Sequence, residues 1–138
     1  MSSNNKVVLS LYDYTGVACV PFARRGFKCF AYDIQHNGTR VDNYPSGGSI
    51  HYLNADLHER EQVLCIGAAF FDLEVAFCMA FPVCTDMAVS GAAHFKSKAL
   101  KDPEFQTKAV NHALWCNEIF ADIGAPYYIE NPVSVLAS

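Results

Sequence analysis

The amino-acid sequence predicts an α/β fold: a Rossmann-like, mostly parallel sheet of about five strands with helices on both faces. Short apolar runs alternate with helical patterns along the chain, which is typical of a parallel sheet. The chain has 138 residues, 51% of them hydrophobic, which suits one core of moderate size. It contains no internal repeat and no low-complexity linker, so we predict a single domain over residues 1–138.

The predicted strands are short apolar runs that end in acidic or turn-forming residues. The first run is nearly continuous, as expected for a strand buried on both faces. The fourth is the most apolar, so we expect it to be central. The five predicted strands cover residues 6–13, 27–33, 50–56, 73–81 and 126–131.

Three helices are predicted between the strands. The first covers residues 20–26, and the second covers residues 57–67 and ends at a glycine. The third covers residues 102–124, with Asp102 and Pro103 at its start and Gly124 at its end. Its apolar positions define one buried face: Phe105, Ala109, Ala113, Cys116 and Phe120.

The segment 35–49 is rich in polar and turn-forming residues, so we expect a long exposed loop there. The chain has no Cys-x-x-Cys or His-x-x-x-His spacing, so no metal site is predicted. No apolar run reaches the roughly 20 residues of a membrane-spanning helix. The amino terminus lacks an export signal, and Cys29, Cys65 and Cys78 lie inside apolar runs. These features favour a reduced, cytoplasmic protein.

Three of the predicted strands end in an acidic residue, at Asp13, Asp33 and Asp56. Right-handed crossovers bring such strand ends to one edge of a parallel sheet. Gly16 would allow close approach of the backbone to a ligand, beside the amides that open the next helix. Asp33 suits the hydroxyls of a ribose, and Asp56 suits the amine of a purine. The alternative is that all three aspartates are helix caps or solvated loop residues.

Cys84 and Glu130 lie at the ends of two strands that we predict to be neighbours, so they should face each other across the same edge. A thiolate is a strong nucleophile, a carboxyl group can exchange a proton, and Asn131 adds a donor and an acceptor. The alternative is that Cys84 is a small core residue and Glu130 a salt-bridge partner.

Taken together, these segments resemble the S-adenosylmethionine-dependent DNA methyltransferases that modify carbon 5 of cytosine, especially the small phage and prophage forms. "LSLYDYTG", "PFARRGFKCFAYDI" and "NAD" resemble the cofactor-binding strands, "FPVCTDMAVSG" the catalytic loop, and "IENP" the Glu-Asn segment. The resemblance implies catalytic roles for Cys84, Glu130 and Asn131. It also implies an S-adenosylmethionine site formed by Tyr12, Asp13, Tyr14, Gly16, Asp33, Ile34, Asp56, Leu57, Phe81 and Pro82.

The implied mechanism is attack of the Cys84 thiolate on carbon 6 of a cytosine turned out of the DNA, with Glu130 at the ring nitrogen. The sequence departs from the family at Val83, where proline is usual, in the single glycine of "YDYTG", and in Pro132 of "ENP". Members of the family continue with a target-recognition region, so we expect a form reduced to its cofactor-binding and catalytic half.

The net charge of −4 gives no indication of the basic surface that DNA-binding domains usually carry, although DNA stays a candidate partner. A sheet edge left unpaired favours a homo-oligomer or a protein partner. The phage resemblance places the protein in a bacterial host cell. The alternative function is a non-catalytic phage factor that binds S-adenosylmethionine or a host protein, in counter-defence or regulation. A third is an enzyme that acts on a free nucleotide.

Overall fold

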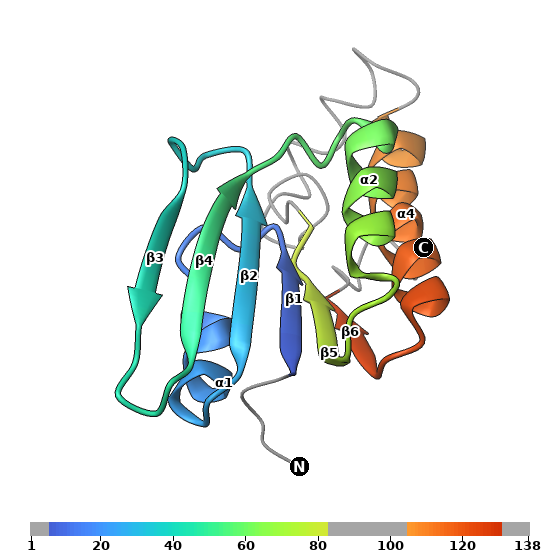
Figure 1. The fold of residues 1–138 in the computed structure, drawn as a ribbon. Coiled ribbons are helices and arrows are strands. Elements are labelled where there is room, and N and C mark those ends of the chain that lie inside the picture. Colours follow the sequence, from blue (N-terminus) through green and yellow to red (C-terminus); the bar gives the residue numbers. More distant parts are fainter. Residues whose placement is uncertain (1–5, 83–104, 131–138) are drawn as a thin grey trace.

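Six strands form one sheet in the order β3-β4-β2-β1-β5-β6 (Figure 1). The structure is a computed structural model, which describes residues 6–82 and 105–130. All neighbouring strands are parallel except the pair β3 and β4. The mostly parallel α/β sheet expected from the sequence is therefore confirmed. The strands are β1 (Val7–Leu11), β2 (Lys28–Asp33), β3 (Arg40–Asn43), β4 (Ser49–Asn54), β5 (Val75–Ala80) and β6 (Tyr127–Ile129).

The sixth strand, β3, lies in the segment that was predicted to be a loop. It pairs antiparallel with β4, with Val41 opposite His51. A tight turn joins the two strands, in which the Tyr44 amide donates to the Gly48 carbonyl at 2.9 Å. The loop prediction was wrong because β3 is an edge strand with most of its side chains in water, so it carries no apolar run.

The buried centre of the sheet is β1, in which every residue is buried, as the sequence predicted. The expectation that residues 73–81 form the central strand was wrong. β5 lies between β1 and the short edge strand β6, and its first three residues are only partly buried. Hydropathy alone does not identify the central strand, because burial also depends on the neighbours that each strand has.

Helices cover both faces of the sheet, as predicted (Figure 1). On one face, a 3-10 turn (Val17–Cys19) and α1 (Val20–Arg24) pack over a cluster that includes Val8 and Ile50. On the other face, α2 (Arg60–Phe70) and α4 (Phe105–Ile123) pack over a cluster that includes Leu9. The sheet therefore separates two apolar layers.

The second helix continues through Gly67, where the sequence analysis expected it to stop. A Cβ atom at Gly67 would lie 2.9 Å from Cγ2 of Ile119 on α4. The glycine therefore permits close packing of the two helices instead of ending one of them.

The buried face predicted for the last helix is present at Ala113, Cys116 and Phe120, and Ile119 joins it. Gly124 follows the helix with φ +83°, as expected of a glycine at a helix end. The predicted start at Asp102 and Pro103, and the side chains of Phe105 and Ala109, lie outside the described part of the chain.

Cys29 and Cys78 are buried within strands, as expected from their apolar surroundings, but Cys65 on α2 is exposed. Burial raises the pKa of the Cys78 thiol to about 12. The apolar run around Cys65 was misleading because a helix turns successive residues toward different environments.

Candidate functional site

The carboxyl ends of the parallel strands form the edge at which ligands bind in open α/β sheets. From β1 the chain moves through β2 to β4, and it then crosses to β5 on the other side of β1. The topological switch point is therefore between β1 and β5. Two hollows open at this edge, and Tyr12 lines both of them.

The smaller hollow has a volume of about 100 Å³ and lies over the ends of β1, β2 and β4. It is lined by Tyr12, Asp33, Ile34, Gln35, Asp56, Leu57 and His58. The larger hollow is open, has a volume of about 440 Å³, and lies over the ends of β1, β5 and β6. It is lined by Tyr12, Asp13, Tyr14, Thr15, Val17, Ala18, Phe81 and Glu130.

Tyr12 is the first residue after β1 and has φ +58°, which is unusual for a residue with a side chain. Its hydroxyl donates a hydrogen bond to the Leu57 carbonyl at 3.1 Å. Burial, followed by the negative charges of nearby groups, raises the pKa of the Tyr12 phenol. The phenol therefore stays neutral and ties the end of β1 to the segment after β4.

Asp33, the last residue of β2, is only 8% exposed. Its Oδ1 atom accepts a hydrogen bond from the Gln35 amide at 2.8 Å. No residue of the described ranges donates to its Oδ2 atom. The neighbouring Ile34 side chain is 58% exposed, which is high for an isoleucine. A free carboxylate oxygen and an apolar side chain therefore border the same hollow.

Asp56, two residues after the end of β4, also lines this hollow. Its Oδ1 atom accepts from the His58 amide at 3.0 Å, and its own amide donates to Gln62 Oε1 at 2.8 Å. The Leu57 side chain is buried in the core, and its carbonyl is bonded to Tyr12. Leu57 therefore meets the hollow only as part of its floor.

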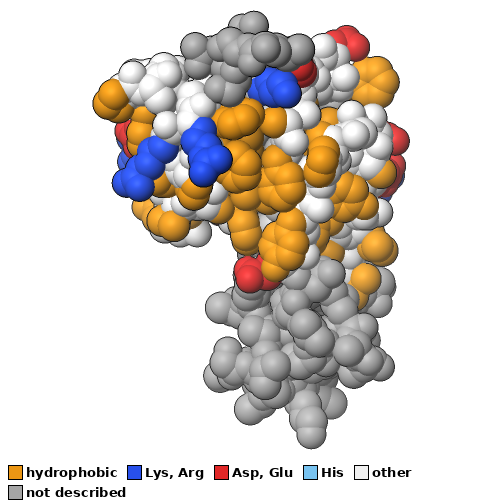
Figure 2. All heavy atoms as spheres, turned by 90° about the horizontal axis from the view of Figure 1, so that it is seen from below, with side chains coloured by type: hydrophobic (Ala, Val, Ile, Leu, Met, Phe, Trp, Pro, Cys, Tyr) orange, Lys and Arg blue, Asp and Glu red, His pale blue; other side chains and the backbone are white. Residues whose placement is uncertain are grey.

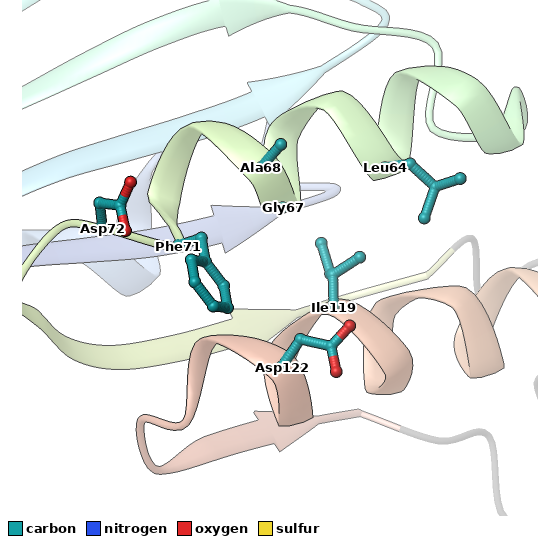
Figure 3. Close-up of a pocket in the computed structure, with 7 residues that line it drawn as sticks. All are labelled: Leu64, Gly67, Ala68, Phe71, Asp72, Ile119 and Asp122. Atoms are coloured by element: carbon teal, nitrogen blue, oxygen red, sulfur yellow. The ribbon is translucent and has the colours of Figure 1, made fainter.

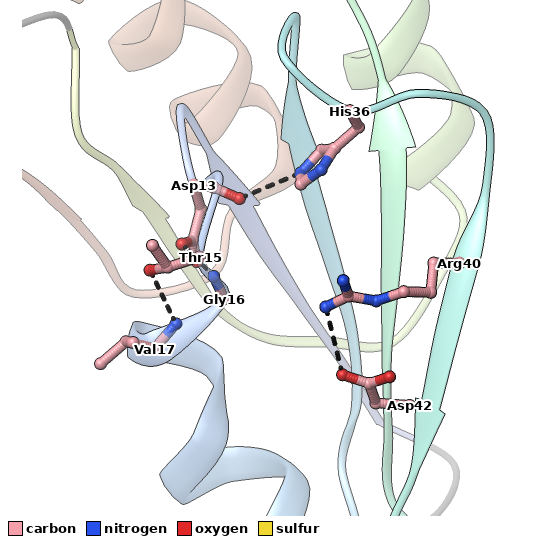
Figure 4. Close-up of polar contacts among 7 residues, drawn as sticks. All are labelled: Asp13, Thr15, Gly16, Val17, His36, Arg40 and Asp42. Atoms are coloured by element: carbon pink, nitrogen blue, oxygen red, sulfur yellow. Dashed lines mark hydrogen bonds and ion pairs between the residues drawn. The ribbon is translucent and has the colours of Figure 1, made fainter.

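The carboxylate of Asp13 is bonded to residues that lie before and after it in the chain. It accepts from the Gly16 amide at 2.8 Å (Figure 4). It also accepts from Ser10 Oγ at 2.8 Å, and the Cys19 thiol lies 3.5 Å away. Asp13 therefore shapes the loop, which corresponds to the local structural role that the sequence analysis left open.

Gly16 has φ +74°, but the space beside it is filled by protein. A Cβ atom there would lie 2.5 Å from the hydroxyl oxygen of Tyr52. In the direction in which a side chain would point, the close approach at Gly16 is therefore to Tyr52, and the approach of a ligand to this backbone stays a prediction.

Two of the amides that follow the Asp13 segment are bonded within the chain. The Gly16 amide is bonded to Asp13, and the Val17 amide lies 3.3 Å from Thr15 Oγ1 (Figure 4). The next element is a 3-10 turn, and α1 has only five residues, with Pro21 in its first turn. Proline has no amide hydrogen to offer.

His36 is a buried residue of this edge that the sequence analysis did not single out. Its Nε2 atom lies 3.2 Å from the Asp13 carbonyl oxygen (Figure 4). The exposed ring of Tyr14 stacks on the His36 ring, with the ring centres 5.4 Å apart. The polar composition of residues 35–49 concealed this role, since nothing local indicates that the segment folds back over β1.

Glu130 directly follows β6 and lines the larger hollow. Ala80 of β5 pairs with Ile129 of β6, and the Glu130 amide donates to the Ala80 carbonyl at 3.0 Å. The predicted neighbourhood of these two strands is confirmed. The Glu130 side chain is exposed.

Phe81 lines the same hollow as Glu130, whereas the buried Pro82 lines neither hollow. Cys84 and Asn131 lie outside the described residues. The juxtaposition of Cys84 with Glu130 therefore stays a prediction.

A second unpredicted feature is a pair of stacked histidines at the smaller hollow. The rings of His58 and His112 lie 3.9 Å apart and are nearly parallel, at 9°. Burial, followed by the charge of His58, lowers the pKa of His112 to about 4, although Asp56 opposes the shift. The pair joins α4 to the edge of the sheet. Residues so far apart in the sequence give no local signal of such a contact.

The rest of the described structure limits the classes of site. Within residues 6–82 and 105–130, no group of three or more His, Cys, Asp or Glu residues is arranged to hold a metal ion. No helix in these ranges has the length and apolar character needed to cross a membrane. On the face at the opposite end of the strands, hydrophobic side chains occupy the middle, and Lys and Arg side chains lie to one side (Figure 2).

Comparison with known proteins gave no match to a family model, a curated protein or a solved structure. Functional conclusions therefore depend on the geometry of the site.

Proposed function

We propose that this chain is a DNA cytosine methyltransferase-like domain of the bacterial cytoplasm, which binds S-adenosylmethionine at the carboxyl edge of its sheet. One observation carries the proposal. At the end of β2, next to the switch point, Asp33 holds a carboxylate oxygen to which no described residue donates, beside the exposed Ile34. A carboxylate at this position of an open α/β sheet suits the hydroxyls of a ribose.

The residues around the smaller hollow fit a nucleoside. Asp33 and Asp56 are acceptors for hydroxyl and amine hydrogens, and Ile34 offers an apolar surface to a flat ring. The volume of about 100 Å³ is small, but the neighbouring hollow of about 440 Å³ is within the usual range for ligand pockets. The adenosine part would bind over β2 and β4, and the remainder would extend past Tyr12.

The chemistry proposed for this edge uses a nucleophile and an acid. When bound, the cofactor would supply a methyl group as an electrophilic sulfonium. The Cys84 thiolate would add to carbon 6 of cytosine, and Glu130 would hold a proton at the ring nitrogen, which makes carbon 5 electron-rich. Asn131 would hold the base through its amide. Later loss of the carbon 5 proton and of the thiolate would restore the aromatic ring.

Calorimetric titration with S-adenosylmethionine tests the binding step. We expect saturable heat, and we expect Asp33→Asn to weaken binding about tenfold or more, because a charged acceptor is lost. Asp42→Asn is the matched control, since Asp42 lies on β3 and lines neither hollow. A folded protein that gives no heat would remove the proposal.

Trapping with DNA that contains 5-fluorocytosine tests the catalytic step. We expect a covalent adduct that depends on the cofactor and is lost in Cys84→Ser. Cys65→Ser is the control, because Cys65 is the exposed cysteine of the described part. An adduct that forms equally in Cys84→Ser would show that the nucleophile is another residue.

A second candidate function is a non-catalytic protein on the same scaffold that binds the cofactor or a host protein. The bonded Asp13 loop favours the form that binds a host protein, since the carboxylate and the Gly16 amide are bonded to each other and not available to a small ligand. Heat with S-adenosylmethionine, without an adduct on any DNA tested, would support this candidate over the enzyme.

A further inference from the structure

A groove separates the outer surfaces of α2 and α4, away from the carboxyl edge of the sheet (Figure 3). Its volume is about 420 Å³. Gly67 and Ile119, which are in close contact, both line the groove, so the two helices meet at this point. Ala68 is a second small residue of the lining. The groove is therefore built into the packing of the two helices.

Large apolar side chains border this groove and face solvent. Leu64 is 42% exposed near one end, and Phe71 is 61% exposed near the other. An exposed phenylalanine beside a groove is unusual on a surface that contacts only water, and such apolar patches commonly mark binding sites. The spacing of seven residues places both side chains on the same side of α2.

The charges beside Phe71 indicate what kind of partner suits the groove. Asp72 and Asp122 both line it, and neither forms an ion pair with any residue of the described ranges (Figure 3). One turn earlier on α4, the carboxylate of Glu118 is paired with Arg60 at 3.2 Å. Glu118 of α4 is therefore paired with α2, whereas Asp72, just after α2, and Asp122 of α4 have no ion pair within the described ranges.

We propose that the groove between α2 and α4 binds an amphipathic helix of a partner protein, with apolar anchors beside Phe71 and Leu64 and with Lys or Arg opposite Asp72 and Asp122. Helices commonly bind in grooves through apolar side chains three, four and seven residues apart. Cations next to the anchors would complement the two carboxylates and orient the helix.

A symmetric pair of this chain is a poorer occupant. In a twofold interface the same patch faces itself, so the carboxylates of both copies would enter one interface without cations from this patch. Like charges brought together in this way oppose association.

The test uses the full chain and two labelled model peptides of 14 residues. One is an amphipathic helix of leucine and lysine, and the other has glutamate in place of every lysine. We expect the lysine peptide to bind in fluorescence anisotropy, with amide shifts in nuclear magnetic resonance spectra confined to α2 and α4. We expect the glutamate peptide not to bind. Absence of lysine-peptide binding at about 1 mM, a concentration that detects weak complexes, would overturn the proposal.

Two variants separate the charge contribution from general attraction to an acidic protein. The double variant Asp72→Asn with Asp122→Asn should weaken binding of the lysine peptide about three- to tenfold, as expected for the loss of two exposed ion pairs. The control pair, Asp42→Asn with Glu61→Gln, removes the same net charge outside the groove and should change binding less than twofold, within the spread for exposed pairs. Equal weakening in both pairs would overturn the proposal.

The apolar contribution is tested with Phe71→Ser, which should fold because the side chain is exposed. We expect Phe71→Ser to weaken binding of the lysine peptide more than the charge variants do. Sedimentation of the wild-type chain completes the test. Self-association that Phe71→Ser abolishes would assign the groove to a second copy and overturn the proposed partner.

Discussion

Replacing Gly16 with alanine should destabilise the fold for two separate physical reasons. The backbone at Gly16 has φ +74°, a left-handed conformation that costs a residue with a side chain about 1–2 kcal/mol. Alanine recovers roughly 0.4–1 kcal/mol of this because it restricts the unfolded chain more than glycine does. The backbone cost alone is therefore about 1 kcal/mol.

The larger cost comes from Tyr52. The new Cβ atom would lie 2.5 Å from its hydroxyl oxygen and 2.6 Å from Cε1, far inside van der Waals contact. The ring has little freedom to move, because the Arg40 guanidinium lies 3.9 Å from its centre on one face and His36 packs against it. Overpacking of this kind costs about 1–3 kcal/mol, so we expect a total loss of about 3 kcal/mol.

Gly38 provides a matched control for the backbone contribution. Its φ of +76° is nearly the same, but a Cβ atom there would meet nothing within 4 Å. Gly38→Ala should therefore cost only about 1 kcal/mol. The difference between the two variants measures the contact with Tyr52.

Urea denaturation followed by circular dichroism measures both free energies of unfolding. With a slope of about 1.5 kcal/mol per molar urea, the Gly16→Ala midpoint should fall about 1 M below that of Gly38→Ala. In a Tyr52→Leu background, the cost of Gly16→Ala should approach that of Gly38→Ala. Equal losses for the two single variants would refute the argument that Tyr52 occupies the space beside Gly16.

Three further results are expected. Nuclear magnetic resonance should show that His112 titrates with a pKa of about 4. Because the unfolded chain takes up this proton near pH 6.5, the free energy of unfolding should fall as the pH drops from 6.5 to 4. This fall should be smaller in His112→Asn. In urea, Phe120→Ala should cost about 3–5 kcal/mol because the side chain is fully buried, whereas Leu114→Ala, at an exposed position, should change stability by about 0.5 kcal/mol or less. In a Cys84→Ser background, Ellman's reagent should modify Cys65 in the folded protein, and denaturant should be needed for the buried thiols of Cys19, Cys29, Cys78 and Cys116.

The sequence by itself determined the elements whose burial follows a local period. The continuous apolar run at residues 7–11 is the fully buried strand β1, and the three- and four-residue spacing of Ala113, Cys116 and Phe120 is the buried face of α4. Right-handed crossovers bring the ends of parallel strands to one edge of the sheet. The sequence therefore also predicted that the carboxylates of Asp33 and Asp56 lie at this edge.

Only the tertiary structure decided the features that depend on contacts between distant residues. The strand β3 exists because it pairs with β4, Gly67 lies within α2 because Ile119 packs against it, and the space beside Gly16 belongs to Tyr52. Hydropathy patterns report how buried each residue is, but they do not report which residue buries it. The neighbours of a residue depend on the order of the strands and the packing of the helices, which the whole chain sets together.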